Sequence, residues 1–136
     1  MQQLQNKTAV ITGANKGIGK ATAISLAKEG VNLGFIARNE TELQALCQEL
    51  EKEYGIKAVY ATADVSVRAE AEAAADSIVS SLGKVDILIN NAGIASFGTL
   101  VDMDPEEWEK IIRVNLMGTY YVTRKILPTI LEQNEG

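Results

Sequence analysis

Tyr121 and Lys125 form a residue pair whose types and spacing suit chemistry. Residues four apart lie on one face of a helix, and a lysine in that position can activate a tyrosine as a proton donor. Such a pair would suit an oxidoreductase. The other interpretation is that both residues lie on an ordinary helix, so the rest of the chain must decide.

A glycine-rich loop, TGANKGIG at 12–19, carries a second kind of chemistry. Glycine lets the backbone turn sharply and approach a pyrophosphate, which then lies on a helix N-terminus. A tight turn also needs glycine, but the position of this loop between a first strand and a first helix favours a nucleotide. The loop residues expected to contact it are Gly13, Asn15, Lys16, Gly17, Ile18 and Gly19.

The segment NNAG at 90–93 follows the fourth apolar run, where a nucleotide-binding sheet has its ligand. Its amide side chains can tie neighbouring strand ends together or contact a ribose. We expect Asn91, Ala92 and Gly93 to contribute to the site. Read alone, the segment is also compatible with an asparagine-rich turn.

Asp64 and Asn115 are polar residues in places that invite a function. Asp64, followed by Val65, comes after the third apolar run and can accept a hydrogen bond from an adenine amino group. Read alone, Asp64 is better explained as a cap before Ser66. Asn115 falls inside the apolar stripe of a helix, where a buried amide needs partners, and the residues alone favour a structural role.

The elements that would position these residues alternate between strand and helix. Apolar runs predict strands at 7–12, 31–37, 56–63 and 85–90. Helices are predicted from about 17 to 28, from 39 to 54, from 66 to 83 and from 104 to about 130. The first is expected to turn Ile18, Ala21, Ile24 (or Ser25) and Leu26 toward the sheet.

Two further helices show their ends or their buried stripe in the sequence. Asn39 and Glu42 have the spacing of a capping box, and Leu43, Leu46, Cys47, Leu50 and Tyr54 form one stripe behind them. In the last helix the expected stripe is Trp108, Ile111, Ile112, Leu116, Thr119, Val122, Ile126 and Ile130. The pattern predicts an α/β fold, a Rossmann-type doubly wound parallel sheet in the order 3-2-1-4.

Composition excludes several classes of function. The chain has 136 residues, a net charge of -5, 1 Cys and no His. These counts argue against nucleic-acid and membrane partners, disulfide frameworks, zinc sites and Ser-His-Asp triads. The N-terminus lacks a secretory pattern, so a cytoplasmic protein is expected.

Taken together, TGANKGIG, Asp64, NNAG and VNLMGTYYVTRKILP resemble the short-chain dehydrogenase/reductase family, most closely its β-ketoacyl-acyl-carrier-protein reductases. The resemblance implies hydride transfer between a nicotinamide cofactor and a carbonyl or alcohol carbon. It also implies a catalytic Tyr, Lys and Ser and an Asn that orders a water relay. Asn115 matches that Asn.

The resemblance also changes the interpretation of Tyr121 and Lys125. In the family, the catalytic Ser and the Tyr-x-x-x-Lys pair come after a fifth strand, and this chain ends before one. Asn115 and Tyr121 would differ by about 9 Å of rise and about 120° of rotation on one helix, so they cannot converge on one substrate carbonyl. We therefore expect the pair to be non-catalytic. The 136 residues are expected to be the N-terminal, cofactor-binding part of a longer enzyme, inactive alone, with 85–90 as an unpaired edge strand.

The cofactor is expected to be NADP. Ala37 stands where an NAD-binding protein carries an acid, Arg38 follows it, and Lys16 faces the same corner. Two cations and no carboxylate suit a 2′-phosphate. Alternatively, Arg38 only pairs with Glu40 or Glu42 on the surface.

The expected partners are a carbonyl or acyl thioester substrate and a second copy of the chain. Trp108, Tyr120, Tyr121 and Leu127 surround more of the helix at 105–131 than one sheet face can cover, which predicts a contact surface. The family resemblance implies that this helix pairs across a two-fold axis in a dimer or tetramer. Two other functions remain open. One is a nucleotide-binding module without catalysis; the other is a flavodoxin-like or receiver-type domain, which the missing acid cluster after the first strand disfavours.

Overall fold

The sheet of this protein has four parallel strands in the order β3-β2-β1-β4, as the sequence predicts. The computed structural model describes residues 3–136. The elements are β1 (Thr8–Thr12), α1 (Gly17–Lys28), β2 (Asn32–Ala37), α2 (Glu40–Tyr54), β3 (Ala58–Thr62), α3 (Arg68–Leu82), β4 (Ile87–Ile89), α4 (Pro105–Ile112), the π-helical segment η1 (Arg113–Gly118) and α5 (Thr119–Glu132). Within the described range, no helix is both long and apolar enough to cross a bilayer.

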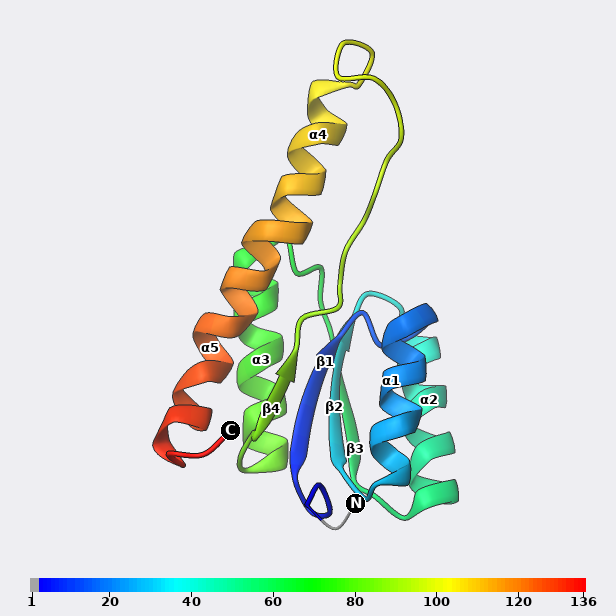
Figure 1. The fold of residues 1–136 in the computed structure, drawn as a ribbon, viewed down its shortest axis with the longest axis vertical. Coiled ribbons are helices and arrows are strands. Elements are labelled where there is room, and N and C mark those ends of the chain that lie inside the picture. The colour runs from blue at the N-terminus through cyan, green and yellow to red at the C-terminus, as the bar shows by residue number, and fades with distance from the viewer. Residues whose placement is uncertain (1–2) are drawn as a thin grey trace.

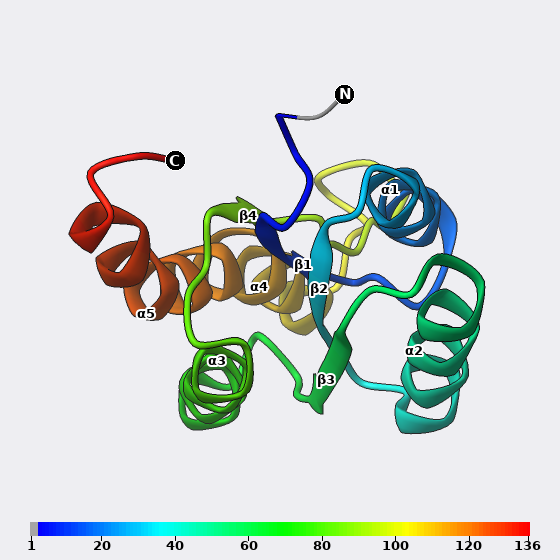
Figure 2. The ribbon, with the colours of Figure 1, turned by 90° about the horizontal axis from the view of Figure 1, so that it is seen from below.

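Helices cover both faces of the sheet (Figures 1 and 2). On one face, α1 and α2 pack on β1 and β2, around Leu33, Phe35 and Leu43. On the other face, α3 and α5 bury Ile78, Val122 and Ile126 against Val10 and Ile36. Because β1 and β2 are buried on both faces, their sequences are apolar runs without alternation.

The buried face of α1 is made of small residues, Gly19, Ala23 and Ala27. The prediction that Ile18 and Ala21 face the sheet is wrong, since both are exposed and Ile18 is 80% exposed. Ile24 and Leu26 are half-buried against the core as expected. The small buried side chains allow α1 to lie close to the strands. The prediction failed because it placed the larger apolar residue Ile18 on the buried face of the helix.

The ends of α2 and α3 follow from local hydrogen bonds. The Asn39 side chain accepts from the Glu42 amide at 3.1 Å, which confirms the predicted cap of α2. Its buried stripe includes Cys47, and burial raises the pKa of that thiol to about 12. α3 begins at Arg68 rather than at Ser66, because Ser66 bonds back to Asp64 in a turn.

The last helix is longer than the sheet it covers, and it contains a π-helical segment. Asp104 caps it by accepting from the Glu106 amide at 2.8 Å. Its buried residues are Val114, Gly118, Val122 and Ile126. The expected stripe is therefore right for Val122 and Ile126 and wrong for Trp108, Ile112 and Leu116, which are exposed. The π-helical turns shift the register of side chains around the axis, and α4 extends beyond the strand ends (Figure 1).

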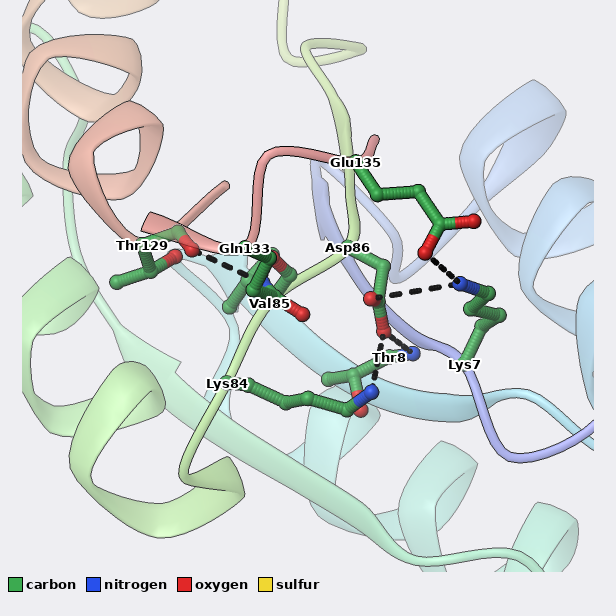
Figure 3. A network of polar contacts seen from close by, with 8 residues as sticks. All are labelled: Lys7, Thr8, Lys84, Val85, Asp86, Thr129, Gln133 and Glu135. Carbon is green, nitrogen blue, oxygen red and sulfur yellow. Dashed lines mark hydrogen bonds and ion pairs between the residues drawn. The ribbon is translucent and has the colours of Figure 1, made fainter. Parts of the chain in front are cut away.

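A polar network joins the amino ends of β1 and β4 to the end of α5 (Figure 3). The buried Asp86 carboxylate accepts from the Thr8 amide at 2.8 Å and lies 3.8 Å from the Lys7 ammonium and 3.5 Å from that of Lys84. The Gln133 amide donates to the Val85 carbonyl at 2.7 Å. These bonds satisfy a buried charge at the end of the sheet opposite to the glycine-rich loop.

Candidate nucleotide-binding site

The glycine-rich loop turns at two residues with left-handed backbone, Gly13 (φ 66°) and Gly17 (φ 57°). The Gly13 amide donates to the Ile36 carbonyl at 2.8 Å, which joins the loop to β2. Gly19 is buried, and a Cβ at this position would lie closer than 3.0 Å to the side-chain nitrogen of Asn91 and to the carbonyl oxygen of Gly13. Two of the three glycines thus pack backbone against backbone.

Asn91 and Thr12 join the carboxyl ends of β1 and β4. The Asn91 side-chain amide donates to the carbonyls of Thr12 and Gly13, both at 3.1 Å. The buried Thr12 hydroxyl accepts from the amides of Asn91 and Ala92 at 3.0 and 2.9 Å. The expectation that an asparagine ties the strand ends is confirmed. Thr12 was missed, although it directly precedes Gly13.

A cavity of about 760 Å³ opens where these strand ends meet. Nine of the twelve residues expected to bind the nucleotide line it: Gly13, Asn15, Lys16, Arg38, Asp64, Val65, Asn91, Ala92 and Gly93. Gly17, Ile18 and Gly19 belong to the same loop but are not in the wall. The wall also contains residues that the sequence did not single out as ligands: Ile36, Ala37, Asn39, Glu40, Glu42, Ala63, Ile94 and Val114.

One corner of the cavity holds charges of both signs. Lys16 and Arg38 line it, and neither forms an ion pair with any residue in the range 3–136, so the alternative that Arg38 pairs with Glu40 or Glu42 is not observed. The expectation that this corner lacks a carboxylate is wrong. Glu40 and Glu42 also line the wall, because α2 begins directly after Arg38 and its first turn faces back toward the glycine-rich loop.

Asp64 is held at the carboxyl end of β3 by the turn that precedes α3. Its Oδ1 atom accepts from the Ser66 amide at 3.0 Å and from the Ser66 hydroxyl at 2.6 Å. The Ser66 hydrogen bonds, and beyond them the positive charges of Arg38 and Lys110, lower the pKa of the Asp64 carboxyl below its ordinary 3.8, against the opposite effect of partial burial. Both bonds use one oxygen atom of Asp64. The residue that caps α3 is Val67, so Asp64 does not cap the helix; it holds the turn before α3 and also lines the cavity.

The lowered pKa of Asp64 predicts a specific dependence of stability on pH. A carboxyl with a lower pKa in the folded chain stabilises the fold above its unfolded pKa, and this contribution is lost as the pH falls through the folded pKa, below 3.8. Asp64→Asn keeps an oxygen for the Ser66 amide but cannot titrate. Its unfolding free energy, from urea denaturation, should fall less than that of the unchanged protein between about pH 5 and about pH 3. Asp102→Asn serves as the control, and equal slopes in all three proteins would contradict the assignment.

Asn115 lies in the π-helical segment and holds the loop that follows β4. Its Oδ1 atom accepts from the Ile94 amide at 2.9 Å, and its Nδ2 atom donates to the Ile94 carbonyl at 2.8 Å. Ile94 and Val114 line the cavity, while Asn115 itself does not. Irregular helical turns of this kind occur often at functional sites. Asn115 is exposed, so the expectation that it lies buried in the apolar stripe is wrong, while its two bonds to Ile94 agree with the expected structural role.

Removing the Asn115 side chain should loosen the loop at Ile94. Asn115→Ala deletes both bonds to Ile94, so hydrogen exchange of the Ile94 amide should accelerate roughly tenfold, the effect of losing about 1.4 kcal/mol. Thr123→Val is a matched control, because Thr123 on the same long helix bonds Asn90 instead. Unchanged exchange at Ile94 in Asn115→Ala would show that the loop is held by other contacts.

The pair Tyr121 and Lys125 faces α3 and not the cavity. The Lys125 ammonium lies 3.0 Å from a carboxylate oxygen of Asp76 on α3. Tyr121 packs against the core between α3 and α5, with its ring 5.9 Å from that of Tyr120. Neither member of the pair lines the cavity. Their position agrees with the prediction that the pair is not catalytic.

Comparison with known proteins identifies relatives over almost the whole chain. A family model described as short chain dehydrogenase matches residues 7–136. A short chain dehydrogenase of Pseudocercospora fijiensis is 40% identical over 137 residues, covering 98% of this chain and 44% of that protein. A 3-oxoacyl-acyl-carrier-protein reductase of Staphylococcus epidermidis is 36% identical over 132 residues, covering 96% of this chain and 54% of that protein. The chain spans about half the length of the curated relatives it matches.

Solved structures have the same fold. An actinorhodin polyketide ketoreductase variant with NADPH superposes with a TM-score of 0.89 at 36% identity, covering 100% of this chain and 52% of that one. An NAD+-bound xylitol dehydrogenase superposes with a TM-score of 0.92 at 28% identity, covering 98% of this chain and 52% of that one. Similar structures therefore contain either nicotinamide cofactor.

Proposed function

This chain belongs to the short chain dehydrogenase family, and on that premise we propose that it forms the cofactor-binding part of an NADPH-dependent reductase of carbonyl substrates. The observation that carries the proposal is the cavity at the carboxyl ends of the strands, lined by the glycine-rich loop and by Arg38. In a doubly wound parallel sheet, nucleotides bind at this end, where the strand order reverses.

The residues of the wall fit a nicotinamide dinucleotide. Gly13 and Gly19 pack so closely against the segment after β4 that a side chain at either position would displace the backbone on which a pyrophosphate would rest. Asp64 keeps one carboxylate oxygen, Oδ2, as an acceptor for an adenine amino group. When bound, the cofactor supplies or accepts the hydride. The chain's own residues bind it, orient it and hold the loop at Ile94 over the site through Asn115.

NADP is proposed over NAD because Lys16 and Arg38 line the corner that a ribose 2′-phosphate would enter. Neither cation is paired with a carboxylate in the described part of the chain, so both stay free to bind a dianion. The NADPH found in a similar ketoreductase structure supports the choice.

The proposed substrate class is β-ketoacyl thioesters. The support is the similarity to a 3-oxoacyl-acyl-carrier-protein reductase, at 36% identity. Asn115 is proposed as a catalytic residue that orders a water relay, in keeping with the family. The cytoplasmic location expected from the sequence stays a prediction.

A second candidate is a nucleotide-binding module without catalysis. The observation in its favour is that Tyr121 and Lys125 lie on the α3 side of the last helix, away from the cavity. Among residues 3–136, no tyrosine lines the cavity. We propose that the 136-residue chain binds the nucleotide and by itself reduces no carbonyl.

Two measurements test the proposal. NADPH binding is measured by fluorescence titration, and turnover is followed by NADPH oxidation with an acetoacetyl thioester. The 136-residue chain should bind NADPH without turnover, whereas the longer protein that contains it should turn over, at a rate that Tyr121→Phe changes less than twofold. Absence of NADPH binding would refute the function, and turnover by the 136-residue chain that Tyr121→Phe abolishes would refute the role given to Tyr121.

Self-association through the last helix is part of the proposal. Trp108 (49% exposed), Leu116 (62%) and Tyr120 (57%) are large apolar side chains of the last helix that the rest of the chain leaves exposed. Leu116→Glu should weaken a dimer or tetramer, because a charge at the centre of an apolar contact loses its hydration. Sedimentation at micromolar concentration should then detect smaller species. Val67→Glu, at the start of α3, is the control, and a protein that is monomeric before any change would exclude this interface.

A further inference from the structure

The Asn15 side chain joins the glycine-rich loop to the first turn of α2. Its amide nitrogen donates to the Glu42 carboxylate at 2.6 Å, across 27 residues of sequence. The Glu42 backbone amide is itself fixed by the Asn39 side chain at 3.1 Å. Glu42 is thereby held at a defined position, and both Asn15 and Glu42 line the cavity.

The charged side chains that line the cavity do not add up to a positive site. Lys16 and Arg38 contribute two positive charges, Glu40 and Glu42 from the first turn of α2 contribute two negative ones, and Asp64 contributes a third negative charge. The Glu40 carboxylate accepts from the Tyr60 hydroxyl of β3 at 3.3 Å, so it is drawn toward the edge of the sheet. The Glu42 carboxylate instead bonds the residue directly before Lys16. Of the two acids, Glu42 is the one attached to the loop that would carry the nucleotide.

We propose that Glu42 is a specificity-determining residue that limits the preference of this site for a phosphorylated ribose. A carboxylate held in the cavity wall by its hydrogen bond to Asn15 repels a 2′-phosphate dianion but not the uncharged 2′-hydroxyl of NADH. Arg38 and Lys16 attract the phosphate, and Glu42 reduces that attraction. The inference rests on the proposed function, since it concerns the same cavity and the same nucleotides.

The test is Glu42→Gln, titrated with NADPH and NADH at low and at high ionic strength. Glutamine keeps an oxygen that accepts from Asn15 and removes only the charge. The dissociation constant for NADPH should fall roughly fivefold at about 0.01 M salt, while that for NADH should stay within about twofold. The gain should shrink at about 0.5 M salt, because the repulsion is screened. Glu49→Gln removes the same charge from the same helix outside the cavity and should change neither constant.

Two other outcomes overturn the inference. If NADPH and NADH change equally, or neither changes, the carboxylate does not set specificity. If Asn15→Ala, which keeps the Glu42 charge, produces the same gain for NADPH, the hydrogen bond and not the charge is responsible. A different result, no binding of either nucleotide by the unchanged protein, would refute the proposed function rather than the role of Glu42.

Discussion

Replacing Gly19 with alanine should destabilise the protein by about 1–3 kcal/mol and abolish measurable NADPH binding. The new Cβ would lie closer than 3.0 Å to the Asn91 amide nitrogen and to the carbonyl oxygen of Gly13. A flexible side chain can move away from such a contact, but a backbone carbonyl at a tight turn cannot do so without moving the turn. The loop that carries Lys16 would therefore change shape.

Two measurements separate the local from the general effect of this change. Urea denaturation gives the unfolding free energy, and fluorescence titration gives the NADPH affinity. Gly98→Ala is the matched control, because a Cβ at Gly98 meets nothing within 4 Å and its backbone does not need glycine. A Gly19→Ala protein that binds NADPH as tightly as the unchanged protein would contradict the packing described for the loop.

Replacing Arg38 with alanine should weaken NADPH binding by about ten- to a hundredfold and leave NADH binding nearly unchanged. The Arg38 guanidinium lines the corner proposed for the 2′-phosphate and has no ion-pair partner among residues 3–136. Charge-assisted hydrogen bonds to a phosphate contribute roughly 1.5–3 kcal/mol each, and NADH offers no such group.

The control for Arg38 is Lys52→Ala, which removes one positive charge from the far end of α2. It should leave both affinities within about twofold, since an exposed charge at that distance is screened by salt. If the unchanged protein binds NADH as tightly as NADPH, or if Arg38→Ala weakens both equally, the assignment of Arg38 to the 2′-phosphate fails.

Much of the fold could be predicted because its signals are local. The apolar runs at β1 and β2 reflect burial on both faces, and Asn39 and Gly55 fix the ends of α2 through their own backbone geometry. Once the strands alternate with helices, the handedness of crossovers leaves few sheet orders, and 3-2-1-4 is the one observed.

The errors lie where packing across the fold overrides the local pattern. The buried face of α1 is set by the close approach of Gly19 to Asn91. Asn91 lies 72 residues further along the chain, so the spacing of apolar residues within the helix does not reveal this contact. Similarly, the buried residues of the last helix, Val114, Gly118, Val122 and Ile126, are the ones that meet the rest of the fold, whereas Leu116 and Ile112 stay exposed.

The candidate site shows the same division. The glycine-rich loop, Asp64 and the segment 91–93 could be identified because each follows a strand. The sequence could not predict that Glu40 and Glu42 line the cavity. These acids follow Arg38 after a short turn into α2, and the direction of that turn decides which of the three side chains face the cavity. A count of charges at the end of β2 therefore overlooks Glu40 and Glu42, which the first turn of α2 brings to the cavity wall.

The pairing of β4 with β1 has a consequence for how the chain folds. The contact between Thr8 and Asp86 joins residues 78 apart, whereas the contact between β3 and β2 at Lys57 and Asn32 spans only 25. Closing the longer loop costs about 1 kcal/mol more in chain entropy. That cost is offset only when β4 pairs with β1 and the Asp86 carboxylate meets its partners. We expect β1, β2 and β3 to assemble first and β4 to join last. Asp86→Asn should then mainly accelerate unfolding and leave the refolding rate nearly unchanged, the kinetic behaviour of a contact absent from the transition state.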